Sequence, residues 1–178
     1  MPQEVAFIIG QVFGVVVVIF GFISFQMKTP ARILVFQIIV AVLFALHYLF
    51  LGAWTAVWLN VLAMVQCVVY YYRDRAGHKG RLLPILFSLS IVAVSLLSWE
   101  GWHTLLIMTG LAIHTLSLSF SRAQSIRIAQ FIKVPCCISY NILVLSFGGA
   151  FYEIAVFTSS LIGTLRNRAE QKRALPKE

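Results

Sequence analysis

Long apolar segments separated by short polar ones dominate the hydrophobic pattern of the chain. A helix needs roughly 20 mostly apolar residues to cross about 30 Å of bilayer hydrocarbon. A transmembrane β-barrel would instead show alternating segments of about ten residues. The pattern therefore predicts an all-α membrane protein with seven transmembrane helices. The predicted spans lie at about residues 6–26, 33–51, 54–72, 82–99, 102–120, 126–147 and 149–165.

Glycines mark the turns between segments that follow each other closely. Leu51-Gly52-Ala53 separates the second and third segments, and Phe147-Gly148-Gly149 separates the sixth and seventh. Glycine adopts the backbone conformations that a tight reversal requires. We therefore predict two helical hairpins whose tips lie at these glycines.

Basic residues fall almost entirely on one side of this predicted bundle. Cytoplasmic loops of membrane proteins carry an excess of Lys and Arg. Of the 14 basic residues, 13 follow the first, third or fifth span or lie in the tail, and only Lys133 lies inside a span. The opposite side carries Glu4 and Glu100 but no Lys or Arg, and Trp54, Trp58, Trp99 and Trp102 form an aromatic belt there. The charges therefore predict a multi-pass inner (plasma) membrane protein with a periplasmic N-terminus and a cytoplasmic C-terminus.

Composition agrees with a lipid environment. The chain of 178 residues is 60% hydrophobic and 11% charged, whereas about 25% of the residues in an average soluble domain are charged. The net charge of +8 does not indicate nucleic-acid binding, because its basic residues lie between apolar segments rather than on one folded face. Cys67, Cys136 and Cys137 have neither metal-ligand nor disulfide spacing. We predict the lipid bilayer as a partner, with no nucleic acid, metal or cofactor, and leave open a homo-oligomer.

A weak internal repeat suggests how the helices are organised. Residues 22–75 align without gaps on residues 115–168 with six identical pairs in 54 positions, including Gln37 with Gln130, and both units end on Arg-x-Arg. An odd span count with one linking helix makes two three-helix units parallel. We therefore predict a 3+1+3 arrangement. Its parts are a first three-helix unit (1–75), a linker helix (76–100), a second three-helix unit (101–168) and a basic cytoplasmic tail (169–178).

Two segments resemble a family of membrane proteins. Residues 22–32, which read Phe-Ile-Ser-Phe-Gln-Met-Lys-Thr-Pro-Ala-Arg, resemble the end of the first helix in PQ-loop and SWEET-type proteins. There, a Pro-Gln pair precedes a basic cytoplasmic turn. Asn60, followed by Gln66 and Arg73, is similar to the polar third helix of that superfamily. Length, low polarity and the basic tail are most similar to the YgjV family of bacterial inner-membrane proteins, a distant relative of that group.

The resemblance implies a carrier in which two three-helix bundles give alternating access to a central site. It implies gating or hinge roles for Gln26 and Pro135, and a substrate-binding Asn60, because an Asn helps to bind sugar in SWEET members. The chain departs from the pattern at two places. Phe25-Gln26 replaces the Pro-Gln pair, and Glu153 stands where a second Asn would match Asn60, which argues against sugar as the substrate.

Polar residues inside the spans are the candidates for a binding site, because polar groups are costly in hydrocarbon. The alternative for each is a hydrogen bond that joins two helices. Asn60 lies about six residues, or roughly 9 Å, from the outer tip of its span. Gln37 and Gln130 coincide under the repeat, and Lys133 can extend to the cytoplasmic interface along its own helix. The predicted substrate-binding residues are Asn60, Gln37, Gln130, Trp58, Asn141 and Glu153.

Three further candidates have two interpretations each. Glu153 either couples protons or faces water close to the outer turn. His47 and His114 either relay protons or pack through hydrogen bonds, and the second interpretation is favoured for both.

The sequence leaves two functions open and makes an enzyme improbable. It contains no phosphate-binding glycine loop, Ser-His-Asp set or paired catalytic acids. We expect a carrier for an unknown small polar solute. The alternative is a non-transporting membrane scaffold or accessory protein. A polar cavity between the two units would favour the carrier, and a dry, close-packed interior would favour the scaffold.

Overall fold

The protein is all-helical over the residues that its computed structural model describes, which are 2–26, 30–76, 80–117 and 123–174. In these ranges every regular element is a helix, as predicted. Seven helices follow one another in the order α1 (Gln3–Gln26), α2 (Pro30–Leu51), α3 (Trp54–Arg75), α4 (Leu82–Leu97), α5 (Thr104–Ser117), α6 (Ala123–Leu143) and α7 (Phe147–Ala174).

Three of the described helices are long and apolar enough to cross a membrane by length and composition, within α1, α2 and α3. The other four helices contribute shorter apolar segments. With 16 and 14 residues, α4 and α5 extend about 24 and 21 Å, which is less than the roughly 30 Å of hydrocarbon. The membrane character of the chain is therefore confirmed, whereas the count of seven spans stays a prediction.

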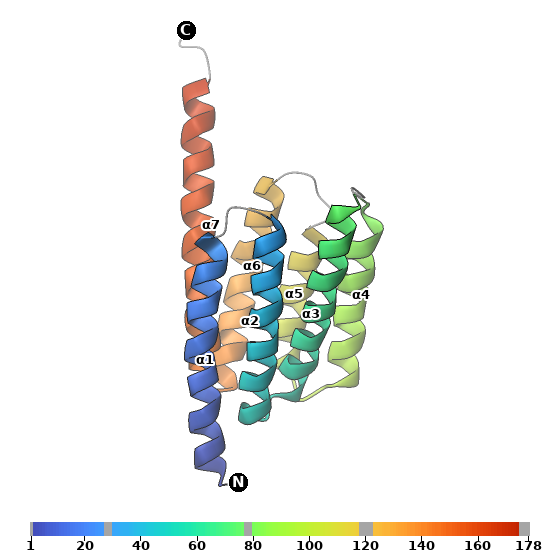
Figure 1. Cartoon of the computed structure of the whole chain (residues 1–178), viewed down its shortest axis with the longest axis vertical. Coiled ribbons are helices and arrows are strands. Elements are labelled where there is room, and N and C mark those ends of the chain that lie inside the picture. Colours follow the sequence, from blue (N-terminus) through green and yellow to red (C-terminus); the bar gives the residue numbers. More distant parts are fainter. Residues whose placement is uncertain (1, 27–29, 77–79, 118–122, 175–178) are drawn as a thin grey trace.

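The helices alternate in direction and form a closed ring (Figure 1). Each helix packs against the next one in the chain, and α1 packs against α7 to complete the ring. One end of the bundle, from which the C-terminal part of α7 extends, contains the ends of α1, α3 and α5 and the beginnings of α2, α4 and α6; we call it the tail end. The opposite end contains the N-terminus and three short turns, and we call it the turn end.

One predicted hairpin tip is confirmed and the other is wrong. Gly52 forms the tip between α2 and α3 with φ +74°, which favours glycine. The α6–α7 turn instead lies at residues 144–146, where Leu145 has φ +55°. Gly148 belongs to the first turn of α7, where a Cβ atom would lie only 2.6 Å from the Gly14 carbonyl carbon of α1. This glycine therefore permits close helix approach rather than chain reversal.

The ring buries aromatic and aliphatic side chains inside and exposes others outside. Val17, Phe44, Val134 and Tyr140 are among the buried core residues. Many large apolar side chains on the outer helix faces are exposed, and Leu89 is one of them. Such an exterior is typical of a protein whose solvent is lipid.

Candidate functional site

A central cavity of about 440 Å³ lies inside the ring. Helices α2 to α7 all contribute to its wall. Gln37 comes from the beginning of α2 and His114 from the end of α5, and both of these helix ends belong to the tail end. The cavity therefore extends toward the tail end, while Leu59 and Tyr152, near the beginnings of α3 and α7, extend its wall into the other half of the bundle. Its lining includes Gln37, Gln66, Cys67, Tyr70, His114, Thr115, Gln130, Lys133 and Tyr152.

Amide side chains are among the residues that line this cavity. Gln130 Nε2 lies 3.2 Å from His114 Nδ1, while Gln130 Oε1 is buried without a hydrogen-bond partner among the described residues. The side chain of Gln37 forms a hydrogen bond with Tyr152. A buried polar atom without a partner is costly, and Gln130 Oε1 is such an atom on a residue of the cavity wall.

A buried ion pair links α6 and α7 beside the cavity. Lys133 Nζ donates to Glu153 Oε1 at 2.7 Å and to Oε2 at 2.8 Å. Each residue is only 7% exposed. Lys133 lines the cavity, whereas Glu153 is not among its lining residues. The charge that faces the cavity from this pair is therefore positive.

The ion pair overturns two interpretations made from sequence. Lys133 does not extend along its own helix to the interface, because its ammonium group binds a carboxylate on α7. Glu153 does not face water at the outer surface, because it is buried. Both charges pack inside the ring instead, since pairing is what makes buried charge tolerable in a membrane.

The turn-end half of the bundle is closed by a hydrogen-bonded layer. His47 is fully buried; its Nδ1 lies 2.6 Å from the Gly10 carbonyl oxygen and its Nε2 lies 2.7 Å from Ser146 Oγ. A carbonyl only accepts, so Nδ1 carries the proton and Nε2 of the neutral ring accepts from the Ser146 hydroxyl. Ser146 Oγ also accepts from the Gly149 N–H at 3.2 Å. Three helices and a turn are thus joined by one chain of hydrogen bonds.

Aromatic residues complete this turn-end layer. The Tyr48 hydroxyl donates to Asn141 Oδ1 at 2.5 Å. The ring of Tyr48 stacks on Phe44 at 5.6 Å and meets Tyr140 edge-on at 6.5 Å. Tyr140, like His47, has no exposed surface. We use the name turn-end layer for Gly10, His47, Tyr48, Asn141 and Ser146.

Glu100 joins the α4–α5 turn to the beginning of α3. Its Oε1 accepts from the Trp54 N–H and its Oε2 from the Thr55 N–H, both at 2.8 Å. The Thr55 hydroxyl also donates to the Ser98 carbonyl. The first N–H groups of a helix have no partner within the helix, and a carboxylate there also meets the positive end of the helix dipole. Glu100 therefore caps α3 from a distant part of the chain.

The structure gathers some of the predicted site residues and separates others. Gln37 and Gln130 both line the central cavity, and Glu153 contacts it through Lys133. Asn141 lies in the turn-end layer. Asn60 Nδ2 donates to the Ala56 carbonyl of its own helix at 2.8 Å, and Asn60 lines a separate hollow between α2 and α3.

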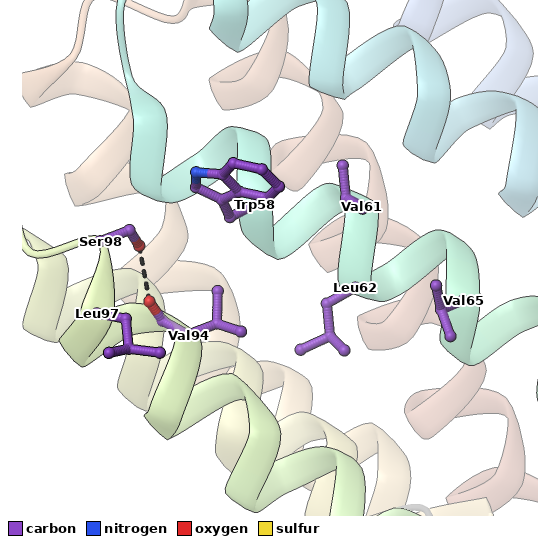
Figure 2. A pocket seen from close by; sticks show the side chains of 7 residues that line it. All are labelled: Trp58, Val61, Leu62, Val65, Val94, Leu97 and Ser98. Atoms are coloured by element: carbon purple, nitrogen blue, oxygen red, sulfur yellow. Dashed lines mark hydrogen bonds between the residues drawn. The ribbon is translucent and has the colours of Figure 1, made fainter.

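Trp58 lies on the outside of the bundle, in an apolar groove between α3 and α4. Figure 2 shows its ring on α3 beside Leu62, with Val94 and Leu97 on the facing helix. The groove encloses about 410 Å³, and Trp58 is 54% exposed. This position agrees with the predicted aromatic belt, whereas it keeps the indole ring away from the central cavity.

The structure does not test the two predicted hinge residues. Gln26 ends α1, and its side chain lies outside the part that the structure describes. Pro135 lies inside α6 and is exposed. Neither position tests a gating role.

Sequence reasoning missed the partners that define the site. It did not pair Lys133 with Glu153, although opposite charges in two consecutive spans were the available signal. It also gave no role to Tyr48, Ser146 or Tyr152. Tyrosine and serine are common in apolar segments, so their presence alone indicates no contact.

Comparison with known proteins places the chain among membrane proteins. A family model described as Imp-YgjV, bacterial inner membrane protein, matches residues 8–171. No curated protein and no solved structure matches the chain. The match covers all seven helices at least in part.

Proposed function

The chain belongs to the Imp-YgjV family of bacterial inner membrane proteins, and from this premise we propose that it carries a small polar solute across that membrane through its central cavity. The observation that supports this proposal is a cavity of about 440 Å³ whose wall includes amide, imidazole and ammonium side chains. A cavity of this size accommodates a small metabolite. Polar groups are expensive in a membrane interior, so their concentration around one space favours a binding function.

We propose the topology that the charges predict, with seven spans, a periplasmic N-terminus and a cytoplasmic C-terminus. The tail end then faces the cytoplasm, and the cavity extends from the middle of the bundle toward that side. The turn-end layer closes the periplasmic half. In this orientation the described conformation is closed toward the periplasm.

Alternating access follows from the 3+1+3 arrangement that we retain as part of the proposal. The first unit (1–75) and the second unit (101–168) rock about the linker (76–100). Hydrogen bonds of the turn-end layer cross between the two proposed units, at His47–Ser146 and Tyr48–Asn141. Opening toward the periplasm requires these bonds to break and the cavity to close at the tail end.

The alternative is a membrane scaffold or accessory protein without transport. Under that alternative the interior serves packing only, and the residues around the cavity bind other helices. The central cavity argues against it, because packing alone gives no reason to gather Lys133, His114 and three glutamines around one space in a membrane interior.

Accessibility of Cys67 tests the carrier. Cys67 lines the cavity, whereas Cys136 and Cys137 do not. In a chain with Cys136→Ala and Cys137→Ala, we expect membrane-impermeant sulfonatoethyl methanethiosulfonate to label Cys67 rapidly in inside-out vesicles and slowly in right-side-out vesicles. A carrier exposes the same cavity to both sides in turn. The matched control adds Cys67→Ala and removes all labelling. A Cys67 that reacts from neither side, or from one side alone, overturns the carrier.

A further inference from the structure

The Lys133–Glu153 pair deepens the proposed function by indicating what the cavity binds. We infer that the solute is a small carboxylate anion, which Lys133 binds while Glu153 takes up a proton. The inference rests on the proposed function. The two members of the pair differ in their relation to the cavity. Lys133 is a lining residue, whereas Glu153 binds Lys133 and is not a lining residue.

The pair itself calls for a reason beyond stability. Replacing a buried ion pair with apolar side chains of similar volume is often neutral or stabilising. Charges within a membrane are therefore a functional feature by default. Lys133 donates two hydrogen bonds to the two oxygens of Glu153, and an ammonium group has a third N–H donor.

The rest of the cavity is suited to a carboxylate. Gln37, Gln66 and Gln130 contribute amide groups to the lining, and each amide nitrogen is a donor. Of the charged side chains, Lys133 is the one among the described lining residues. An anion that enters therefore meets a positive charge and neutral donors, with no acidic group in the wall.

Charge balance requires a proton. With the solute absent, Lys133 and Glu153 together carry no net charge. When a carboxylate R–COO⁻ accepts hydrogen bonds from Lys133 Nζ in place of Glu153, the site would carry an uncompensated negative charge inside the membrane. Glu153 then takes up one proton (H⁺) from the bulk solution on the side from which the anion enters, and the site returns to neutrality. Release of the anion to the other side reverses both steps, so one proton moves with each negative charge.

Among the titratable groups around Glu153, no other described residue is a carboxylate that could take up the proton. Cys137 on α6, Tyr48 on α2 and Tyr152 on α7 all lie close enough to interact electrostatically with its carboxylate. His114 on α5 interacts with Lys133. Helix α1 contributes only Glu4, in its first turn at the turn end. Glu153 is thus the only carboxylate in the described part of this cluster.

Ligand binding to the purified full chain tests the inference. The probes are the monocarboxylates propionate and L-lactate, with the matched neutral amides propionamide and L-lactamide. We expect a carboxylate to raise the unfolding temperature, and its apparent Kd to increase up to about tenfold per pH unit above neutrality because one proton binds with it. No response to either carboxylate overturns the inference, as does an equal response to the neutral compounds.

Three variants separate recognition from folding. Glu153→Gln should retain carboxylate binding and lose its pH dependence. The double variant Lys133→Met with Glu153→Gln contains no buried charge, so it should fold and bind carboxylates at least tenfold more weakly. The exchange Lys133→Glu with Glu153→Lys keeps an ion pair but presents a carboxylate to the cavity, so it should also lose binding. Unchanged binding in the double variant assigns the pair a structural role and overturns the inference.

The two tests fail in different ways. If Cys67 is labelled from both sides and no carboxylate binds, the carrier stands and the anion inference is wrong. If a carboxylate binds in a pH-dependent manner and Cys67 is labelled from one side alone, the site is a receptor pocket and the carrier is wrong.

Discussion

The two halves of the bundle use the same helices in different ways. In the turn-end half, His47 is fully buried with a partner on each ring nitrogen. In the tail-end half, His114 lines a cavity and has one long contact, 3.2 Å from Gln130. Polar groups that are fully satisfied hold helices together, and polar groups that face open space are available to a ligand. The same residue types therefore indicate closure in one half and binding in the other.

The largest expected effect comes from Lys133→Met, which breaks the pair beside the cavity. The substitution leaves Glu153 buried without its partner, and removing one member of a buried ion pair typically costs about 3–5 kcal/mol. Unfolding in mixed micelles should show this loss of stability. Adding Glu153→Gln should restore most of it, because no buried charge then remains. A fully stable single variant would mean that the pair is not buried as described.

The same substitution in both halves tests the comparison directly. His47→Ala removes a fully buried ring and leaves Ser146 without its acceptor, so we expect a loss of about 2–4 kcal/mol. His114→Ala removes a ring that already borders a cavity and has one contact, 3.2 Å from Gln130, so we expect a smaller loss than for His47→Ala. Equal losses, measured by unfolding in mixed micelles, would contradict the difference between the halves.

The contact between α1 and α7 provides the third test. A Cβ atom added by Gly148→Ala would lie 2.8 Å from the Gly14 carbonyl oxygen, so the helices must separate. Overpacking of this kind costs about 1–3 kcal/mol. Gly80→Ala is the matched control, because nothing lies within 4 Å of its added Cβ. The ring is not closed at this contact if both variants unfold like the wild type.

The smallest expected effect concerns the cap of α3 at the turn end. Glu100→Ala removes the acceptor of two backbone N–H groups, and losing a helix cap costs about 1 kcal/mol. Glu4→Ala removes an exposed acid from the first turn of α1 and should cost less. If the two variants have the same unfolding midpoint, the Glu100 cap contributes nothing to closure.

The sequence was sufficient for the helices and for part of the cavity. Apolar segment length predicted the helices because hydrocarbon forces the backbone to satisfy its own hydrogen bonds. Gly52 identified its turn correctly. Gln37 and Gln130, matched by the repeat register, both line the cavity. The lengths of the apolar segments and the register of the internal repeat were informative because both depend only on positions along the sequence.

Orientation of side chains around each helix could not be predicted in the same way. A membrane helix is apolar toward lipid and apolar toward its neighbours, so periodicity does not distinguish the two faces. Asn60 illustrates the problem, because its amide bonds to its own helix and needs no cavity. The hairpin at Gly148 was wrong for a related reason, since a glycine serves close packing as well as chain reversal.

The turn-end layer also constrains the order in which the protein can be made. Its bonds connect residues that are 37 and 99 positions apart in the chain. A ribosome adds about 5–20 residues per second, so Ser146 is synthesised about 5–20 s after His47. During that interval the His47 imidazole lies in an incomplete bundle without its Ser146 partner. Closure of the ring is therefore the last event of biogenesis, and a chain interrupted before Ser146 cannot complete it.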